Sequence, residues 1–272
     1  MISRIIRYVV LGVLGIIWLL PIYLLLANAG KSNASFSGTQ LWSSGSLTDL
    51  WANVMLVFTT TDVGAGFGVS TIYAIVAPVI AVILGACVGF AVIVLKLKNG
   101  FVWFFILFCG TVFPIQMMVI PWFTFSANTG LYDSIVAMII LYSVVALPFS
   151  AFVMRNFFAG IAESVFEASV VDGANVWQIF TRIYLPMSSS ALVVVFILQA
   201  TWVWNDFLLS LILTQSTARP LMPLLNALQG TQGGGPGYTV VLTAAIVVSL
   251  PTAALFLFTQ RFFQKGLALG QY

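Results

Sequence analysis

The sequence predicts an all-α, polytopic membrane protein, and three observations support this fold class. Of the 272 residues, 61% are hydrophobic and 6% carry a charge, whereas a soluble domain has about 25% charged residues. The apolar residues gather into stretches of about 20 or more, the length that a helix needs to cross a bilayer. The lysines and arginines lie mostly in the short segments between these stretches, where they set the orientation of a membrane protein.

Six stretches are long and apolar enough to form transmembrane helices. In chain order they are Tyr8–Ala29, Val69–Leu95, Phe101–Phe123, Ser134–Met154, Ser189–Leu213 and Thr239–Phe258. Several contain proline, which membrane helices tolerate because neighbouring groups re-satisfy the freed carbonyls. In the second stretch Gly85 and Gly89 share one helical face, which predicts close packing against another helix.

The first stretch also has features of a secretory signal peptide. Arg4 and Arg7 precede the apolar run, and Ala27-Asn28-Ala29 follows it. The apolar run has about 20 residues, which is longer than the core of about 7–15 residues in a signal peptide. We therefore expect a first helix that is not cleaved.

The positive charges predict that both termini are cytoplasmic. With the N-terminus inside, eight basic residues lie inside and two outside, and the opposite orientation would invert this bias. The eight are Arg4, Arg7, Lys96, Lys98, Arg155, Arg182, Arg261 and Lys265, and the two are Lys31 and Arg219. The location that follows is multi-pass in the cell (inner or plasma) membrane, in contact with lipid.

The spans divide the chain into two parts. We expect residues 1–68 to form the first helix and an external loop, and residues 69–272 to form a five-helix core with a cytoplasmic loop at 155–187. Two outer segments, Gly30–Gly68 and Thr214–Tyr238, are long, and the second ends in the glycine-rich run 230–237. Such a run is typical of a mobile or tightly turned segment. It is either a passive linker or a contact for a soluble partner outside.

Composition argues against several functions. The chain has no histidine, and Cys87 and Cys109 lie in apolar runs, so we expect neither a metal site nor a disulfide. The sequence offers no nucleophile motif and no inward-facing carboxylate pair, so we expect no catalytic residues, no enzyme activity and no cofactor in this chain. The basic residues are spread over short loops, which is not the pattern of a nucleic-acid partner.

Polar chemistry concentrates in the predicted cytoplasmic loop 155–187, which is too short for an independent domain of about 50 residues. Asp172-Gly173 is a turn signal that ends a first short helix. Trp177, Phe180 and Tyr184 recur at three and four, which predicts a second helix with an apolar stripe. We expect Pro186 to stop it, and the pair to lie at the membrane surface with its aromatic face exposed. Periodicity alone leaves an ordinary interfacial loop equally open.

The residues from Glu167 to Pro186 follow the pattern Glu-Ala-Ser-x₃-Gly-x₉-Ile-x-Leu-Pro. This pattern resembles the EAA loop of binding-protein-dependent ABC importer permeases, with Ser169 where a second alanine is usual. In that family the loop forms coupling helices that sit in a cleft of the ATP-binding subunit. The resemblance implies an ATPase-coupling role for Glu167, Ala168, Ser169, Asp172, Gly173, Trp177, Phe180, Ile183, Leu185 and Pro186.

Other segments resemble the carbohydrate-uptake branch of that family, and in particular the second permease of maltose transporters. They are Leu147–Phe149, Met154–Phe158, Trp204–Phe207 and Gln260–Leu267. The resemblance implies a six-helix type I importer (MetI-like) fold and a sugar or oligosaccharide as substrate. It also implies a second permease subunit, a dimeric ATPase that binds the ATP, and an external solute-binding protein. A non-sugar solute stays open, and a secondary transporter or channel is the alternative from another class.

Asp206 is the one acid that lies clearly within a predicted span, and such residues usually face a cavity or a partner. Gln199, Trp202 and Asp206 are spaced at three and four, with Asn205 beside them. Aromatic, amide and carboxylate groups suit a sugar, so these four residues are candidates for the substrate pathway. Alternatively, Asn205 and Asp206 bond neighbouring helices or a helix end.

Overall fold

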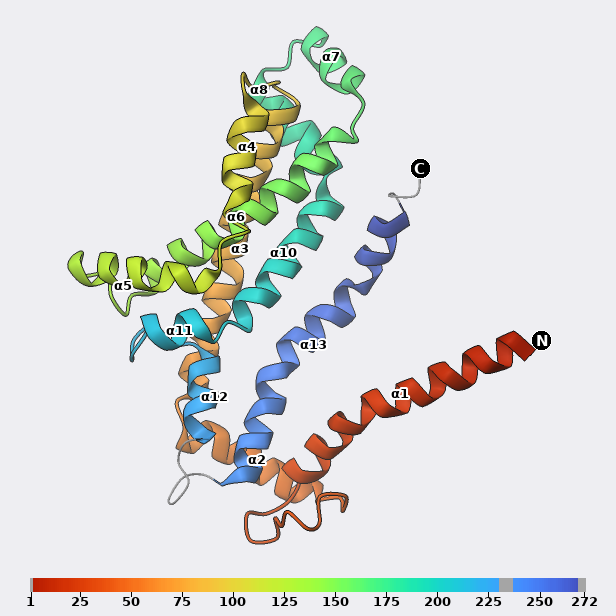
Figure 1. The fold of residues 1–272 in the computed structure, drawn as a ribbon, viewed down its shortest axis with the longest axis vertical. Helices are drawn as coiled ribbons and strands as arrows, with labels where there is room; N and C mark the ends of the chain where they lie inside the picture. Colours follow the sequence, from red (N-terminus) through yellow and green to blue (C-terminus); the bar gives the residue numbers. More distant parts are fainter. Residues whose placement is uncertain (1, 230–236, 269–272) are drawn as a thin grey trace. The chain divides into compact units, whose positions relative to one another are not determined.

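The structure is a computed structural model that describes residues 2–229 and 237–268, and the described residues form helices and no strand (Figure 1). The glycine-rich run predicted at 230–237 lies outside them except for Gly237. The first helices are α1 (Ile2–Ala29), α2 (Leu47–Thr60), α3 (Val63–Ile93), α4 (Gly100–Cys109), the 3₁₀-helix η1 (Ile115–Met118), α5 (Val119–Asn128) and α6 (Ile135–Ala159). The others are α7 (Glu163–Val171), α8 (Val176–Gln178), the π-helix η2 (Ile179–Tyr184), α9 (Leu185–Met187), α10 (Ser189–Trp204), α11 (Leu208–Leu213), α12 (Leu221–Gln229) and α13 (Tyr238–Ala268).

Within the described residues, four helices are long and apolar enough to cross a membrane, namely α1, α3, α6 and α13. A fifth candidate is the bent pair Val176–Met187 and Ser189–Trp204, whose halves meet at 75°. The outer segments predicted as loops also contain helices, because α2 lies within Gly30–Gly68 and α12 within Thr214–Tyr238. Each of the six predicted stretches contains helix, but they are not six continuous helices.

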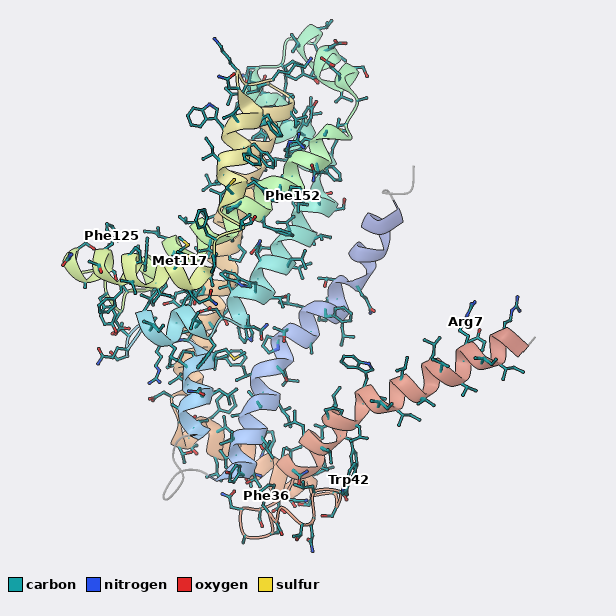
Figure 2. All side chains as sticks on the ribbon, viewed as in Figure 1. Arg7, Phe36, Trp42, Met117, Phe125 and Phe152 are labelled. Carbon is teal, nitrogen blue, oxygen red and sulfur yellow. The ribbon has the colours of Figure 1, made fainter. Side chains whose placement is uncertain are left out.

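The prediction of one continuous helix over Phe101–Phe123 is wrong. Helix α4 ends at Cys109, and the chain resumes as η1 after Pro114, which has no N–H to continue a helix. Figure 1 shows α5 running across the direction of α4, and Figure 2 places Met117 and Phe125 along this arm. The apolar run is thus split into two short helices in different directions.

The fifth stretch, Ser189–Leu213, is also broken. Helix α10 ends at Trp204, and α11 begins at Leu208. At 1.5 Å per residue the 16 residues of α10 extend about 24 Å, which is less than the hydrocarbon thickness of about 30 Å. Asn205–Phe207 therefore lies at the end of a short helix, with α11 continuing from it.

The chain forms two compact units, of which the first comprises residues 1–67 and 223–251. Polar side chains fasten the end of α1 to the segment that follows it. Asn53 donates to the carbonyls of Ala29 (2.8 Å) and Lys31 (2.9 Å). The buried Lys31 ammonium donates to Asn28 Oδ1 (2.8 Å) and to the Gln40 carbonyl (2.6 Å). The apolar part of α1 is not buried within the described residues, so lipid or another chain must cover it.

The second unit comprises residues 68–222 and 252–272 and contains both candidate sites. Its α3 and α6 pack closely through the two glycines noted in the sequence. A Cβ on Gly85 would lie 2.7 Å from the Ala151 nitrogen, and one on Gly89 would lie 2.7 Å from the Arg155 nitrogen. The predicted close packing at Gly85 and Gly89 is confirmed, and it holds α6 in place as the support for the segments that follow.

Candidate functional site

The turn at Asp172-Gly173 has the conformation that the sequence predicts. Gly173 has φ +79°, a conformation that glycine adopts without the steric cost of a Cβ. The Gly173 N–H donates to the Val170 carbonyl (3.0 Å) and the Ala174 N–H to the Ser169 carbonyl (3.1 Å), which is the Schellman pattern that closes a helix. Asn175 then begins α8 with a capping box to Gln178. The turn is thus defined on both sides.

The prediction that the aromatic stripe is exposed is wrong for two of its three residues. Phe180 and Tyr184 are buried, with 5% and 2% of their surface exposed. Their rings lie 5.0 and 5.2 Å from the ring of Phe90 on α3, and Tyr184 also packs on Phe158 of α6. The three residues therefore do not form one stripe: Trp177 lies on the exposed side, whereas Phe180 and Tyr184 face the helix bundle, where burial of their rings stabilises the unit. We call residues 163–187 the coupling element, after the role that the sequence resemblance implies, and these contacts pack it on α3 and α6.

The opposite side of the coupling element is exposed and partly apolar. Val171 is 86% exposed and Trp177 is 69% exposed, with Val176 beside them. Glu167, Ala168, Asp172 and Gly173 are also exposed, whereas Ser169 is buried and donates to the Val165 carbonyl (2.6 Å). Large apolar side chains on a polar turn are a feature of protein contact sites. The structure thus separates the predicted coupling residues into an outward set and an inward set.

The prediction that Pro186 stops the second helix is wrong. The helical segment continues through Pro186 to Met187 and bends just after it. Residues 179–184 form a π-helix, and the Leu185 N–H donates to the Phe180 carbonyl, five residues back. Proline lacks the N–H that would restore the α-helical pattern. The bend of 75° follows at the buried Ser188, whose hydroxyl donates to the Tyr184 carbonyl (2.7 Å). π-Helical turns are frequent at functional sites, and this one joins the coupling element to α10.

An ion pair that the sequence did not reveal joins the start of α7 to the segment after α3. Lys96 donates to the Glu163 carboxylate, and both side chains are largely exposed. This hydrogen bond, reinforced by the charge of Glu163, raises the pKa of Lys96. Lys96 has φ +48°, which is unusual for a residue other than glycine. Because the pair is exposed, it orients α7 more than it stabilises the fold.

At the far end of α10, Asp206 lies at the break before α11. Its Oδ2 accepts hydrogen bonds from the Tyr142 hydroxyl of α6 (2.8 Å) and the Ser210 N–H (3.0 Å), and its Oδ1 accepts one from the Leu209 N–H (3.4 Å). A carboxylate at a helix N-terminus satisfies free N–H groups and interacts favourably with the helix dipole. These hydrogen bonds match the alternative inferred for Asp206 from the sequence, in which it bonds a neighbouring helix or a helix end rather than the substrate.

The four predicted pathway residues do not share one cavity. Asn205 and Asp206 border a cavity of about 770 Å³ between α10, α11 and α13, with Thr201, Thr252 and Phe256. Gln199 borders another cavity, of about 690 Å³, formed with α4, η1 and α6. Trp202 borders both cavities. The structure thus brings Trp202, Asn205 and Asp206 together and leaves Gln199 on the other side of Trp202.

Asp133, just before α6, is a polar centre that the sequence analysis missed. Its carboxylate accepts the backbone N–H groups of residues 215–218 at 2.8–3.1 Å and the hydroxyl of Ser216 at 3.0 Å. Partial burial is the largest influence on the Asp133 pKa and pushes it upward, but the four N–H groups together outweigh burial and lower the pKa to about 2. An Asp-Ser pair before an apolar run is typical of a helix start, but no local pattern shows a bond to residues more than 80 positions away.

Comparison with known proteins agrees with this fold. Residues 95–268 match the family "Binding-protein-dependent transport system inner membrane component". The chain is 29% identical to the inner membrane ABC transporter permease protein YcjP of Escherichia coli, over 98% of this chain and 96% of that protein. It is 26% identical to the diacetylchitobiose uptake system permease protein NgcG of Streptomyces coelicolor, over 94% of this chain and 85% of that one.

A solved structure shows the same fold. A chain in the crystal structure of a bacterial ABC transporter involved in the import of the acidic polysaccharide alginate superimposes with a TM-score of 0.81 at 22% sequence identity, covering 96% of both chains. The chain therefore belongs to the family of binding-protein-dependent transport system inner membrane components. It is a permease subunit of an ABC importer, a multi-pass protein of the cell membrane that works with an ATPase and a solute-binding protein.

Proposed function

We propose that this permease subunit imports a sugar or oligosaccharide and receives the force of ATP hydrolysis through the coupling element, residues 163–187. The observation that carries the proposal is the two-sided geometry of this element. Its outward side exposes Val171 and Trp177, and its inward side buries Phe180 and Tyr184 against α3 and α6. Because the inward side is packed on these helices, a partner that binds the outward side and shifts it moves the helices with it as a rigid body.

The orientation and assembly follow from the same proposal. The uneven distribution of basic residues supports a cytoplasmic location of both termini and of the coupling element, with α4, η1 and α5 together supplying the third of six spans. The ATPase is a dimer that binds the ATP, and a second permease subunit completes the translocation pathway. The apolar surface of α1, which the described residues leave uncovered, is consistent with a contact to such a partner or to lipid.

The substrate class rests on the relatives and on the cavity between α10, α11 and α13. One relative is a permease protein of a diacetylchitobiose uptake system, and the fold neighbour belongs to a transporter involved in alginate import. In this chain the cavity combines Trp202, Phe207 and Phe256 with the polar groups of Thr201 and Asn205. Aromatic faces together with amide and hydroxyl groups match the apolar faces and hydroxyl groups of a sugar ring. We propose that Trp202 and Asn205 face the substrate. Asp206 instead joins the end of α10 to the start of α11 and to Tyr142 of α6.

The importer is tested by reconstitution. The chain and its co-purifying subunits are placed in proteoliposomes, and uptake of labelled diacetylchitobiose and of alginate oligosaccharides is measured with and without ATP. The proposal expects ATP-dependent uptake of a saccharide that stops when the ATPase is omitted. Saccharide uptake that persists without the ATPase would instead indicate a secondary transporter.

Variants of the cavity separate the two interpretations of Asp206. Asp206→Asn can keep a carbonyl oxygen at the Oδ2 position that faces Tyr142 and Ser210, so we expect nearly full uptake. Trp202→Ala removes the aromatic face and should reduce uptake strongly, while Trp202→Phe retains part of it. If Asp206→Asn abolishes uptake in an intact complex, the charge itself is required, and the assignment of Asp206 to the junction is incomplete.

A further inference from the structure

The outer segment 214–220, between α11 and α12, is held by side chains from two distant parts of the chain. Asp133 accepts the N–H groups of four successive residues, 215–218. From α3, the Tyr73 hydroxyl donates to the Ala218 carbonyl (2.8 Å) and the Ser70 hydroxyl accepts the Leu221 N–H (2.9 Å). Six hydrogen bonds therefore join these side chains to backbone groups of residues 215–221, five through N–H groups and one through the Ala218 carbonyl. The bond from the Ser216 hydroxyl to Asp133 is additional.

This arrangement directs the side chains of the segment outward. Because four consecutive N–H groups converge on one carboxylate, the backbone curls around Asp133. Thr214, Ala218 and Pro220 are buried, whereas Gln215, Ser216 and Thr217 are exposed. The result is a rigid, uncharged polar surface of three residues, which we call the outer knuckle (Gln215, Ser216 and Thr217).

The position of the outer knuckle indicates its partner. α10 begins next to the coupling element and ends next to α11, so the outer knuckle and the coupling turn lie beyond opposite ends of α10. In the proposed importer α10 belongs to a membrane span, so a partner at the outer knuckle is on the other side of the membrane from the ATPase. Fixing a loop before binding reduces the conformational entropy that is lost on association, so a preformed polar loop is suited to a soluble protein that binds repeatedly.

We infer that Asp133 is a positioning residue that holds the outer knuckle as a preformed contact for the external solute-binding protein. The inference rests on the proposed function, because it needs an importer with an external partner. The partner surface that fits is one that offers hydrogen-bonding groups to the amide of Gln215 and to the hydroxyl groups of Ser216 and Thr217.

The hydrogen bonds are tested by amide hydrogen exchange on the full-length chain in lipid nanodiscs. In Asp133→Asn one oxygen becomes an NH₂ group that cannot accept, so either the pair 216 and 217 or the pair 215 and 218 should lose protection by about fivefold or more. Asn tolerates the positive φ of Asp133 (+53°), so the variant should fold. Asp133→Ala should deprotect all four amides. Protection that is unchanged in both variants would overturn the clamp.

The role is tested by the ATPase activity of the reconstituted complex as its solute-binding protein is added. For Asp133→Asn we expect the half-stimulating concentration to rise about fivefold or more, with basal and maximal rates unchanged. Asp62→Asn, a change of an exposed acid in the other outer segment, should leave the titration unchanged. Unchanged stimulation despite deprotected amides would overturn the positioning role. If no binding protein stimulates the wild type, the proposed function itself fails, while the exchange result still decides the clamp.

Discussion

At the scale of single residues, Gly173 shows how one backbone conformation defines a docking turn. Its φ of +79° costs other residues about 1–2 kcal/mol, and proline cannot adopt it. Gly173→Pro also removes the N–H that bonds the Val170 carbonyl. A Cβ added at Gly173 would meet nothing within 4 Å, so the effect of a substitution comes from the backbone and from the partner.

We predict that Gly173→Pro leaves membrane insertion intact and weakens association with the ATPase, and that Glu167→Lys, which reverses an exposed charge on the same surface, does the same. The measurement is co-purification of the ATPase with each tagged variant. Gly160→Ala is the control, because Gly160 has ordinary right-handed dihedral angles and lies at the C-terminal end of α6, just before the coupling element. Normal recovery of the ATPase with both variants would show that this turn is not the docking site.

The carboxyl of Asp133 gives a prediction about pH. Its pKa is about 2 in the folded protein and about 3.9 in an unfolded chain. A lowered pKa contributes stability that is fully present above the unfolded value and is lost as the pH falls through about 4 towards 2. We therefore expect a fluorophore on the outer segment to report no change between pH 8 and pH 5. A transition near pH 6 in the wild type, absent from Asp133→Asn, would contradict this.

At the scale of helices, the contact between α3 and α6 supports both candidate sites. Since the Gly85 and Gly89 positions leave no room for a Cβ, larger side chains must push the helices apart. Overpacking of this kind typically costs about 1–3 kcal/mol. The same displacement would disturb the rings of Phe90 and Phe158, on which Tyr184 packs.

We predict that Gly85→Val and Gly89→Val lower the melting temperature of the detergent-solubilised chain and reduce coupled uptake. Gly12→Val in α1 is the control, because a Cβ at Gly12 would meet nothing within 4 Å. Equal melting temperatures for the three variants would mean that the glycines do not fix the packing of α3 on α6.

The comparison of sequence and structure is most instructive for the helices. Hydropathy located every apolar stretch, because burial in lipid requires long runs of apolar residues. It did not predict the breaks at Gly110–Pro114 and Asn205–Phe207, because proline and polar residues are also tolerated inside membrane helices. Periodicity predicted the stripe of Phe180 and Tyr184 but not its direction, since an apolar face suits a bundle and a partner equally.

The candidate sites show the same limit. The turn at Gly173 was predictable because its chemistry is local, and the structure has it as expected. The bonds of Asp206 to Tyr142, of Lys96 to Glu163 and of Asp133 to the outer segment join residues far apart in the chain. No spacing rule reaches over such distances, so these bonds required the structure.

At the scale of the whole molecule, each unit has a separate set of contacts to offer. The first unit carries α1, whose apolar surface is not covered within the described residues. The second unit carries the coupling element before α10 and Asp206 with the outer knuckle after it. In our proposal the ATPase acts on the coupling element at the N-terminal end of α10, and the substrate and the binding protein act near its C-terminal end. Helix α10 therefore connects the two sites.

The most direct test of this account is site-specific cross-linking in the assembled complex. A photoreactive phenylalanine replaces Val171, which is 86% exposed beside the turn, and in a second variant replaces Val136, which is exposed at the opposite end of α6. The account predicts a cross-link to the ATPase from position 171, reduced by Gly173→Pro, and none from position 136. An ATPase cross-link from position 136 and none from position 171 would contradict the assignment of residues 163–187 as the coupling element.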